Sequence, residues 1–243
     1  MRVVAVGDAH GEPGQDLTKY RALGNYAAEH GIDHVVLIGD FITMQSLSSF
    51  EKPGSAGMEG WHIEDEINYG CQALEQINSA GGKFQLHYIE GNHEDRIKKW
   101  IEGEARLQGL VSLERAYESL VDSWTPYRHA LTLGGVLFTH VPFNQTKAVG
   151  GVYPAYRASL LVNKSIVFGH THKVGVHPFG TFGDVAVNFA INIGCFFEQE
   201  YDPDYMDGRI KSYWRGIFDL EVADSTIKSF DMIPLDKLKT EYK

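Results

Sequence analysis

The stretch Ser165-Ile166-Val167-Phe168-Gly169-His170-Thr171-His172 joins a short apolar run to a glycine and two histidines. Short, continuous runs rich in Val and Ile are typical of strands buried on both faces of a sheet. Glycine after such a run admits a positive φ and lets the backbone turn sharply beside a ligand. We therefore predict a buried strand that carries His170 and His172 into a polar site.

Three other apolar runs end in glycine followed by a residue type that binds metals, and one more ends in a histidine alone. They are Val3-Val4-Ala5-Val6-Gly7-Asp8-Ala9-His10, Val35-Val36-Leu37-Ile38-Gly39-Asp40, Leu86-His87-Tyr88-Ile89-Glu90-Gly91-Asn92-His93 and Gly135-Val136-Leu137-Phe138-Thr139-His140. In open α/β sheets, ligands bind outside the carboxyl ends of the strands, so residues that follow different strands meet there. The set expected to converge is Asp8, His10, Asp40, Asn92, His93, His140, His170 and His172.

The ligand types at these junctions are carboxylate, imidazole and amide oxygen, without any thiolate. This mixture suits borderline to hard divalent metals, and we expect manganese, with iron, nickel and zinc as alternatives. Two ions are expected, because the set exceeds the needs of one tetrahedral or octahedral site. Asp40 is the expected bridge, since a carboxylate has two oxygens with spare lone pairs. The expected metal ligands are Asp8, His10, Asp40, Asn92, His140, His170 and His172.

Two such ions favour phosphoester hydrolysis. When they lie roughly 3.5 to 4 Å apart, they lower the pKa of a shared water, orient the bridging hydroxide and neutralise charge on the phosphoryl group. His93 adjoins Asn92 and is the predicted catalytic residue, free to stabilise the transition state or protonate the departing oxygen. Arg96, three residues further on, either contacts the substrate phosphate or forms a surface salt bridge.

None of these short patterns is specific by itself. An Asp-x-His or His-x-His pattern alone is incidental in roughly three cases out of four, and a buried histidine usually serves only as a hydrogen-bonding group. Their succession along one chain, each beside a predicted strand, is what favours a metal site.

Composition favours an ordinary globular protein. The chain has 243 residues, of which 43% are hydrophobic and 22% charged, and we expect one domain over residues 1–243. No stretch approaches the length of a membrane span, and the first apolar run reaches Gly7 too early for a signal peptide, so a cytoplasmic protein is expected. The net charge of −10 argues against a broad surface for duplex nucleic acid. The charge does not exclude a nucleotide or a nucleic acid end as the substrate, because bound cations invert the local charge at the site.

Helical patterns alternate with the early strands, and strand patterns dominate the second half. Helices are predicted over residues 17–30, 63–79 and most of 96–122. Later strands are predicted at 131–140, 165–168, 185–193, 213–222 and 226–233, the last two joined as a hairpin. Asp16 is the expected N-cap of the first helix and Gly31 its stop. Two segments, 44–62 and 196–210, are expected to influence selectivity. Residues 196–205 form an acidic and aromatic loop, which is a lid, an oligomer contact or plain surface.

The ordered motifs Gly7-Asp8-Ala9-His10, Gly39-Asp40, Gly91-Asn92-His93-Glu94, His140 and Gly169-His170-Thr171-His172 resemble those of the calcineurin-like metallophosphoesterase superfamily. The resemblance implies an α/β fold, a four-layer αββα sandwich with a dinuclear metal site at the strand ends. It also implies that Asp8, His10, Asp40 and His172 hold one metal, that Asp40, Asn92, His140 and His170 hold the other, and that His93 is catalytic.

The second and third motifs distinguish branches of the superfamily. In protein phosphatases the second continues as Gly-Asp-x-Val-Asp-Arg-Gly and the third follows an Arg. This chain has Gly39-Asp40-Phe41-Ile42-Thr43-Met44 and Glu90-Gly91-Asn92-His93-Glu94, so it departs from that pattern. The spelling Gly169-His170-Thr171-His172 looks like the branch with repair nucleases, cyclic-nucleotide phosphodiesterases and small phage-encoded phosphoesterases, and the chain is most similar to the phage group.

Three functions are compatible with these observations. The leading one is a metal-dependent phosphodiesterase that acts on a nucleotide or a nucleic acid end. A phosphomonoesterase, including one that dephosphorylates proteins, is the second. The third is a catalytically silent, metal-bound scaffold that recognises a protein partner through the acidic and aromatic segment 196–205; a homo-oligomer is compatible with each.

Overall fold

The structure, a computed structural model, describes residues 1–49, 58–180, 186–199 and 213–243. The strands are β1 (Arg2–Val6), β2 (His34–Ile38), β3 (Gln85–Ile89), β4 (Ser123–Thr125), β5 (Leu131–Leu133), β6 (Val136–Thr139), β7 (Phe143–Asn144), β8 (Lys147–Ala148), β9 (Ile166–Phe168), β10 (Val174–Phe179), β11 (Asn188–Ile193), β12 (Gly216–Ala223) and β13 (Thr226–Pro234). The α-helices are α1 (Thr18–Glu29), α2 (Ile63–Asn78), α3 (Asp95–Gly103), α4 (Leu113–Tyr117), α5 (Pro154–Ser159) and α6 (Leu235–Glu241). Short 3-10 helices are η1 (Gln45–Leu47) and η3 (Ala105–Leu107).

The described strands form two main sheets, in the orders β13-β12-β1-β2-β3-β4 and β10-β11-β9-β6-β5, and a separate β7-β8 ribbon. The centre of each sheet is parallel: β1, β2, β3 and β4 run together in the first, and β6, β9 and β11 in the second. Antiparallel strands extend them at the sides, with β12 and β13 in the first sheet and β5 and β10 in the second. The parallel strands therefore place their carboxyl ends on common edges, as the sequence predicted.

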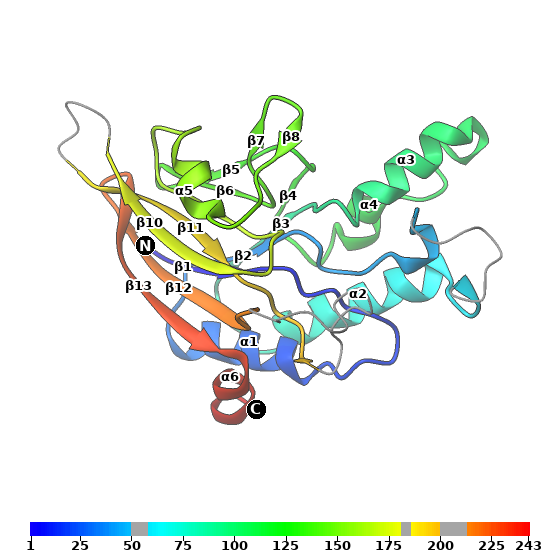
Figure 1. The fold of residues 1–243 in the computed structure, drawn as a ribbon. Helices are drawn as coiled ribbons and strands as arrows, with labels where there is room; N and C mark the ends of the chain where they lie inside the picture. Colours follow the sequence, from blue (N-terminus) through cyan, green and yellow to red (C-terminus); the bar gives the residue numbers. More distant parts are fainter. Residues whose placement is uncertain (50–57, 181–185, 200–212) are drawn as a thin grey trace.

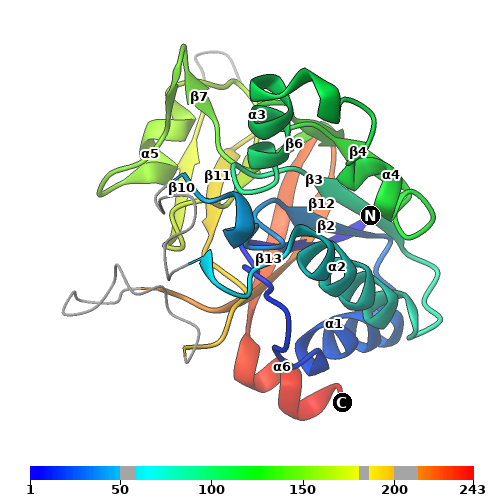
Figure 2. The ribbon, with the colours of Figure 1, turned by 90° about the vertical axis from the view of Figure 1, so that its right-hand side faces the viewer.

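Successive side chains of each strand point to opposite faces of its sheet, and the core consists of three apolar layers. On β1, Val4 and Val6 face the helices α1, α2 and α6, whereas Val3 and Ala5 face the second sheet. A third apolar cluster joins Phe168 and neighbouring residues of the second sheet to α5. Figure 1 shows α1, α2 and α6 on one side of the sheets and α5 on the other, and Figure 2 shows the same separation after a quarter turn. Four layers, helices, sheet, sheet and helices, follow from this packing, which confirms the predicted αββα class.

Several local predictions can be compared with the structure. The segment 96–122 is helical with interruptions, as α3, η3 and α4, and the strands β12 and β13 form the predicted hairpin around Asp224 and Ser225, both at positive φ. Asp16 is not the N-cap of α1, because that helix starts at Thr18; its carboxylate instead accepts a hydrogen bond from the Thr18 backbone N–H at 3.1 Å. Gly31 does follow the helix at φ 59°.

The sequence did not predict β10, which is an edge strand of the second sheet. It contains Gly175 and Pro178, and Pro cannot donate to a ladder, so this residue is confined to edges. These two residues masked the strand signal. No helix of the described residues is long and apolar enough to cross a membrane.

Candidate metal centre

The predicted ligands follow five parallel strands of the two sheets. Asp8 and His10 follow β1, Asp40 follows β2, and Asn92 with His93 follows β3. The remaining three, His140, His170 and His172, follow β6 and β9 of the second sheet. Backbone hydrogen bonds hold these loops together: the Asp40 carbonyl accepts from the N–H of Ala9 and His10, and the His140 carbonyl accepts from Gly169.

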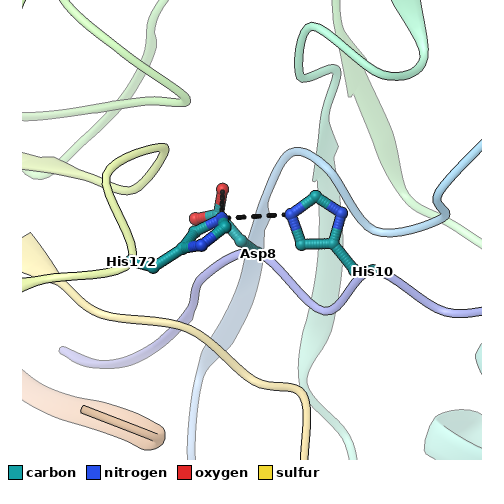
Figure 3. A group of neighbouring side chains, drawn as sticks. All are labelled: Asp8, His10 and His172. Atoms are coloured by element: carbon teal, nitrogen blue, oxygen red, sulfur yellow. Dashed lines mark hydrogen bonds and ion pairs between the residues drawn. The ribbon is translucent and has the colours of Figure 1, made fainter. Parts of the chain in front are cut away.

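Asp8, His10 and His172 form one group of metal-ligand atoms, which all lie within 4.8 Å of one another. The His172 Nε2 lies 3.4 Å from Asp8 Oδ1 and 3.1 Å from His10 Nε2. Figure 3 shows the two imidazoles and the carboxylate converging from two separate loops. Asp8 is completely buried, and its two oxygens also accept hydrogen bonds from the His170 backbone N–H.

Asp40, His140 and His170 form a second group within the same 4.8 Å limit. The His140 Nε2 lies 3.4 Å from Asp40 Oδ2, 3.2 Å from His170 Nδ1 and 3.0 Å from the amide oxygen of Asn92. The other ring nitrogen of His140, Nδ1, lies 2.9 Å from the Ile38 carbonyl oxygen and donates to it. This bond fixes the tautomer, so that the Nε2 lone pair points at the other ligand atoms.

Asp40 connects the two groups, since it also belongs to a third set with His10 and His93. Its Oδ2 lies 4.0 Å from His10 Nε2 and 3.8 Å from His93 Nε2. The distances fit the expected bridging position. They also bring His93, predicted to act apart from the ligands, within reach of the same carboxylate.

The electrostatics of the site favour the ligand forms of His10 and Asp40. Burial, followed by the neighbouring His93 and His172, holds the pKa of His10 well below its usual range, so its imidazole is neutral. Burial opposes ionisation of Asp40, but His140, His93 and His10 lower its pKa well below the usual range and keep it a carboxylate. Neutral imidazole and ionised carboxylate are the forms that bind metal ions. The donor set therefore fits divalent cations.

Four of the predicted ligands adopt a backbone conformation that L-residues rarely use. The φ angles are 43° at His10, 48° at Asp40, 70° at His170 and 56° at His172. Non-glycine residues in this region cost of order 1 to 3 kcal/mol each and persist only where the surroundings impose them, often at functional sites. This strain supports convergence on a common ligand and could not be read from the sequence.

His93 and Arg96 share one backbone carbonyl. The His93 Nδ1 lies 2.6 Å from the Thr43 carbonyl oxygen and donates to it, which turns Nε2 toward Asp40. Arg96 Nη1 donates to the carbonyls of Thr43 and Met44, each at 3.0 Å, and Nη2 lies 3.4 Å from His93 Nε2. Among the described residues Arg96 forms no ion pair, and its two alternatives, a contact to substrate phosphate and a surface salt bridge, stay predictions.

Glu94 is a residue whose role the sequence did not show, although it stands in the third motif. Its buried carboxylate lies between the loops after β2 and β3 and accepts five hydrogen bonds. The donors are the backbone N–H groups of Asp40, Phe41, Ile42 and Gly91 and the Tyr88 hydroxyl, at 2.7 to 3.3 Å. Burial and the charge of Asp40 raise the pKa of Glu94 to about 7. Glu94 thus fixes the backbone that carries Asp40 and Asn92.

The first part of the segment 196–210 forms a wall of the site. Phe196 and Phe197 are fully buried, and the Phe197 ring lies 5.5 Å from the His10 ring and 5.2 Å from the His172 ring, in edge contacts. Glu198 pairs with the buried Lys19 at 3.2 Å. Phe196 and Phe197 are therefore not plain surface, whereas a lid and an oligomer contact stay predictions. Tyr201, Tyr205 and the rest of 200–212 lie outside the described residues.

Gly91 and Gly169 each precede a predicted ligand, and no side chain fits at either position because another ligand lies too close. A Cβ on Gly169 would press on the Asp8 carboxylate, and one on Gly91 would press on Asp40. Gly150 has nothing within 4 Å of the corresponding position.

Gly169→Ala is expected to lower activity by at least about a hundredfold. The added Cβ would displace the Asp8 carboxylate, and a misplacement of about 1 Å in a catalytic site can cost about a hundredfold in rate. Metal content by elemental analysis and turnover by a phosphodiester assay measure the effect. Gly150→Ala is the matched control and should leave both unchanged. Equal behaviour of the two variants would contradict the close approach.

Histidine, aspartate and asparagine side chains that converge at the strand ends of an αββα sandwich fit the class of metal-dependent hydrolases. A family model, calcineurin-like phosphoesterase, matches residues 1–174, a span that contains every predicted ligand, and the chain belongs to this family. Members are metal-dependent phosphoesterases, so the predicted enzyme class is confirmed and a catalytically silent scaffold is not retained. Among curated proteins, no sequence matches the chain.

Proposed function

We propose that the protein is a phosphodiesterase that uses two divalent ions, manganese in the first instance, to cleave a nucleotide or a nucleic acid end. The observation that carries this proposal is the carboxylate of Asp40, whose Oδ2 reaches His140 on one side and His10 on the other. When bound, two such ions would activate water and neutralise charge on the phosphoryl group. The departure of the second and third motifs from the protein phosphatase pattern favours a diester substrate.

We propose distinct roles for the residues around Asp40. Asp8, His10, Asp40 and His172 would hold one ion, and Asp40, Asn92, His140 and His170 would hold the other. His93 would act on the leaving oxygen, since its Nδ1 bond to Thr43 leaves Nε2 facing the site.

We propose a narrower role for Arg96 than its position in the sequence suggests. Nη1 is occupied by two backbone carbonyls, so only Nη2 is directed toward His93 and the substrate position. We propose that Arg96 positions His93, with the contact to substrate phosphate confined to Nη2.

Hydrolysis of bis(p-nitrophenyl) phosphate and p-nitrophenyl phosphate by the metal-free protein, reloaded in turn with Mn²⁺, Fe²⁺, Ni²⁺ and Zn²⁺, tests the proposal. We expect turnover of the diester to exceed that of the monoester, to be greatest with Mn²⁺ and to disappear after chelation. His93→Ala should abolish turnover while metal content persists. A faster monoester reaction would favour the phosphomonoesterase, and inactivity on both substrates with every metal would overturn both.

We also propose that residues 1–243 form one domain, because the two sheets share one apolar layer to which β12 and β13 contribute. Limited proteolysis followed by mass spectrometry would test this, and a stable fragment ending near residue 174 would contradict it.

A further inference from the structure

The loop after β4 brings an arginine to the edge of the site. Tyr127 and Arg128 follow β4, whose carboxyl end lies beside that of β3 in the first sheet. The Tyr127 ring lies 6.1 Å from the ring of His140 and 5.8 Å from that of Phe143. The planes of the Tyr127 and Phe143 rings are nearly perpendicular, at 77°. Phe143 follows His140 by three residues, so both aromatic side chains adjoin one of the predicted ligands.

The Arg128 guanidinium lies over these two rings. Its Cζ is 4.9 Å from the Phe143 centroid and 5.7 Å from the Tyr127 centroid. Cation–π contacts at such distances attract a guanidinium to the faces of aromatic rings. The Arg128 side chain is exposed, and within the described part of the chain no carboxylate pairs with it.

Hydrogen bonds on both sides of Arg128 fix the backbone of this loop. Arg128 has a φ of 69°, in the left-handed region. On one side of it the Tyr127 N–H donates to the buried Glu90 carboxylate at 2.9 Å, and on the other the His129 carbonyl accepts from the Thr139 hydroxyl at 2.9 Å. The loop therefore holds the backbone of Arg128 in one conformation.

A second arginine occupies the opposite flank of the site and serves as a comparison. Arg215 lies 5.6 Å from the Phe197 centroid, but Phe197 is fully buried and Arg215 is half-buried. Arg128 is instead an exposed cation beside the site, in a chain whose net charge is −10. A guanidinium that is exposed to solvent is suited to bidentate binding of a phosphate.

We propose that Arg128, held by Tyr127 and Phe143, is a binding subsite for a second phosphate of the substrate, adjacent to the phosphodiester that is cleaved. This inference rests on the proposed phosphodiesterase function and narrows its substrate class to phosphorylated nucleic acid ends and nucleotides with a further phosphate. The subsite selects substrates and takes no part in bond cleavage.

Cleavage of the thymidine dinucleotides TpT and pTpT, which differ only in a terminal phosphate, tests the subsite. The wild-type protein is expected to cleave pTpT with a KM about tenfold below that for TpT, the size of one charge-assisted contact. Arg128→Ala should remove this difference and leave TpT and bis(p-nitrophenyl) phosphate unchanged. Arg128→Lys should restore part of the preference, since a lysine keeps the charge but loses the bidentate geometry.

Arg21→Ala is the matched control, because Arg21 is an exposed arginine on α1 that bonds Gln76 and its removal changes the net charge equally. It should keep the wild-type preference. Equal effects of Arg128→Ala on TpT and pTpT, or no wild-type preference for pTpT, would overturn the subsite alone. Failure of the wild-type protein to cleave any diester would overturn the phosphodiesterase function and the subsite with it.

Discussion

Asp40→Asn is expected to lower turnover of a phosphodiester by at least about a thousandfold. Asparagine has nearly the same shape, but it loses the negative charge and one carboxylate oxygen. Oδ2 of Asp40 is the oxygen that faces His10, His93 and His140. Metal ions stabilise transition-state charge by several kcal/mol, and each 1.36 kcal/mol is a factor of ten in rate. The carboxylate also accepts the His93 backbone N–H at 2.9 Å, so its loss disturbs that residue as well.

Initial rates and elemental analysis of the purified variant measure this effect. We expect the bound metal to fall by about half or more, because both proposed ions share this ligand. Asp224→Asn is the control: it makes the same change in charge on an 83% exposed side chain in the β12–β13 turn. Full metal content together with wild-type turnover in Asp40→Asn would show that Asp40 is not a shared ligand.

Glu94→Ala is expected to lower the free energy of unfolding by about 3 kcal/mol or more. Each buried donor left without a partner costs about 1 to 3 kcal/mol, and this change removes the acceptor of four backbone N–H groups and the Tyr88 hydroxyl. The affected backbone carries Asp40 and Asn92, so metal affinity should fall together with stability.

Urea denaturation followed by circular dichroism measures this change. Glu94→Gln should have a smaller effect, because its amide oxygen still accepts some of these hydrogen bonds. It should still destabilise the protein, because the amide N–H₂ group cannot accept the others. Glu102→Ala, an exposed glutamate on α3, should stay within about 0.5 kcal/mol of the wild-type protein. If Glu94→Ala unfolded at the wild-type urea concentration, the five hydrogen bonds would not stabilise the two loops.

Much of the fold was predictable because the relevant signals are local. A strand buried on both faces needs a continuous apolar run, and β1, β2, β3, β6 and β9 have one. Where a strand is short or interrupted, as in β4 and β10, neighbours in the sheet decide its conformation and the sequence pattern is weak. The helical interpretation of 96–122 held because its breaks coincide with glycines.

The sequence by itself determined which residue types reach the site, because a ligand follows each of five buried strands, after a glycine in four of them, and the parallel strands of a sheet share one edge. Only the tertiary structure showed that Glu94 fixes the loop of Asp40, 54 residues away, that Phe197 forms a wall beside His10, and that Arg128 lies over Phe143. These roles depend on contacts between segments that are distant along the chain, and no periodicity or motif encodes such distances. The same holds for the positive φ angles of the ligands, since the packing of both sheets imposes them.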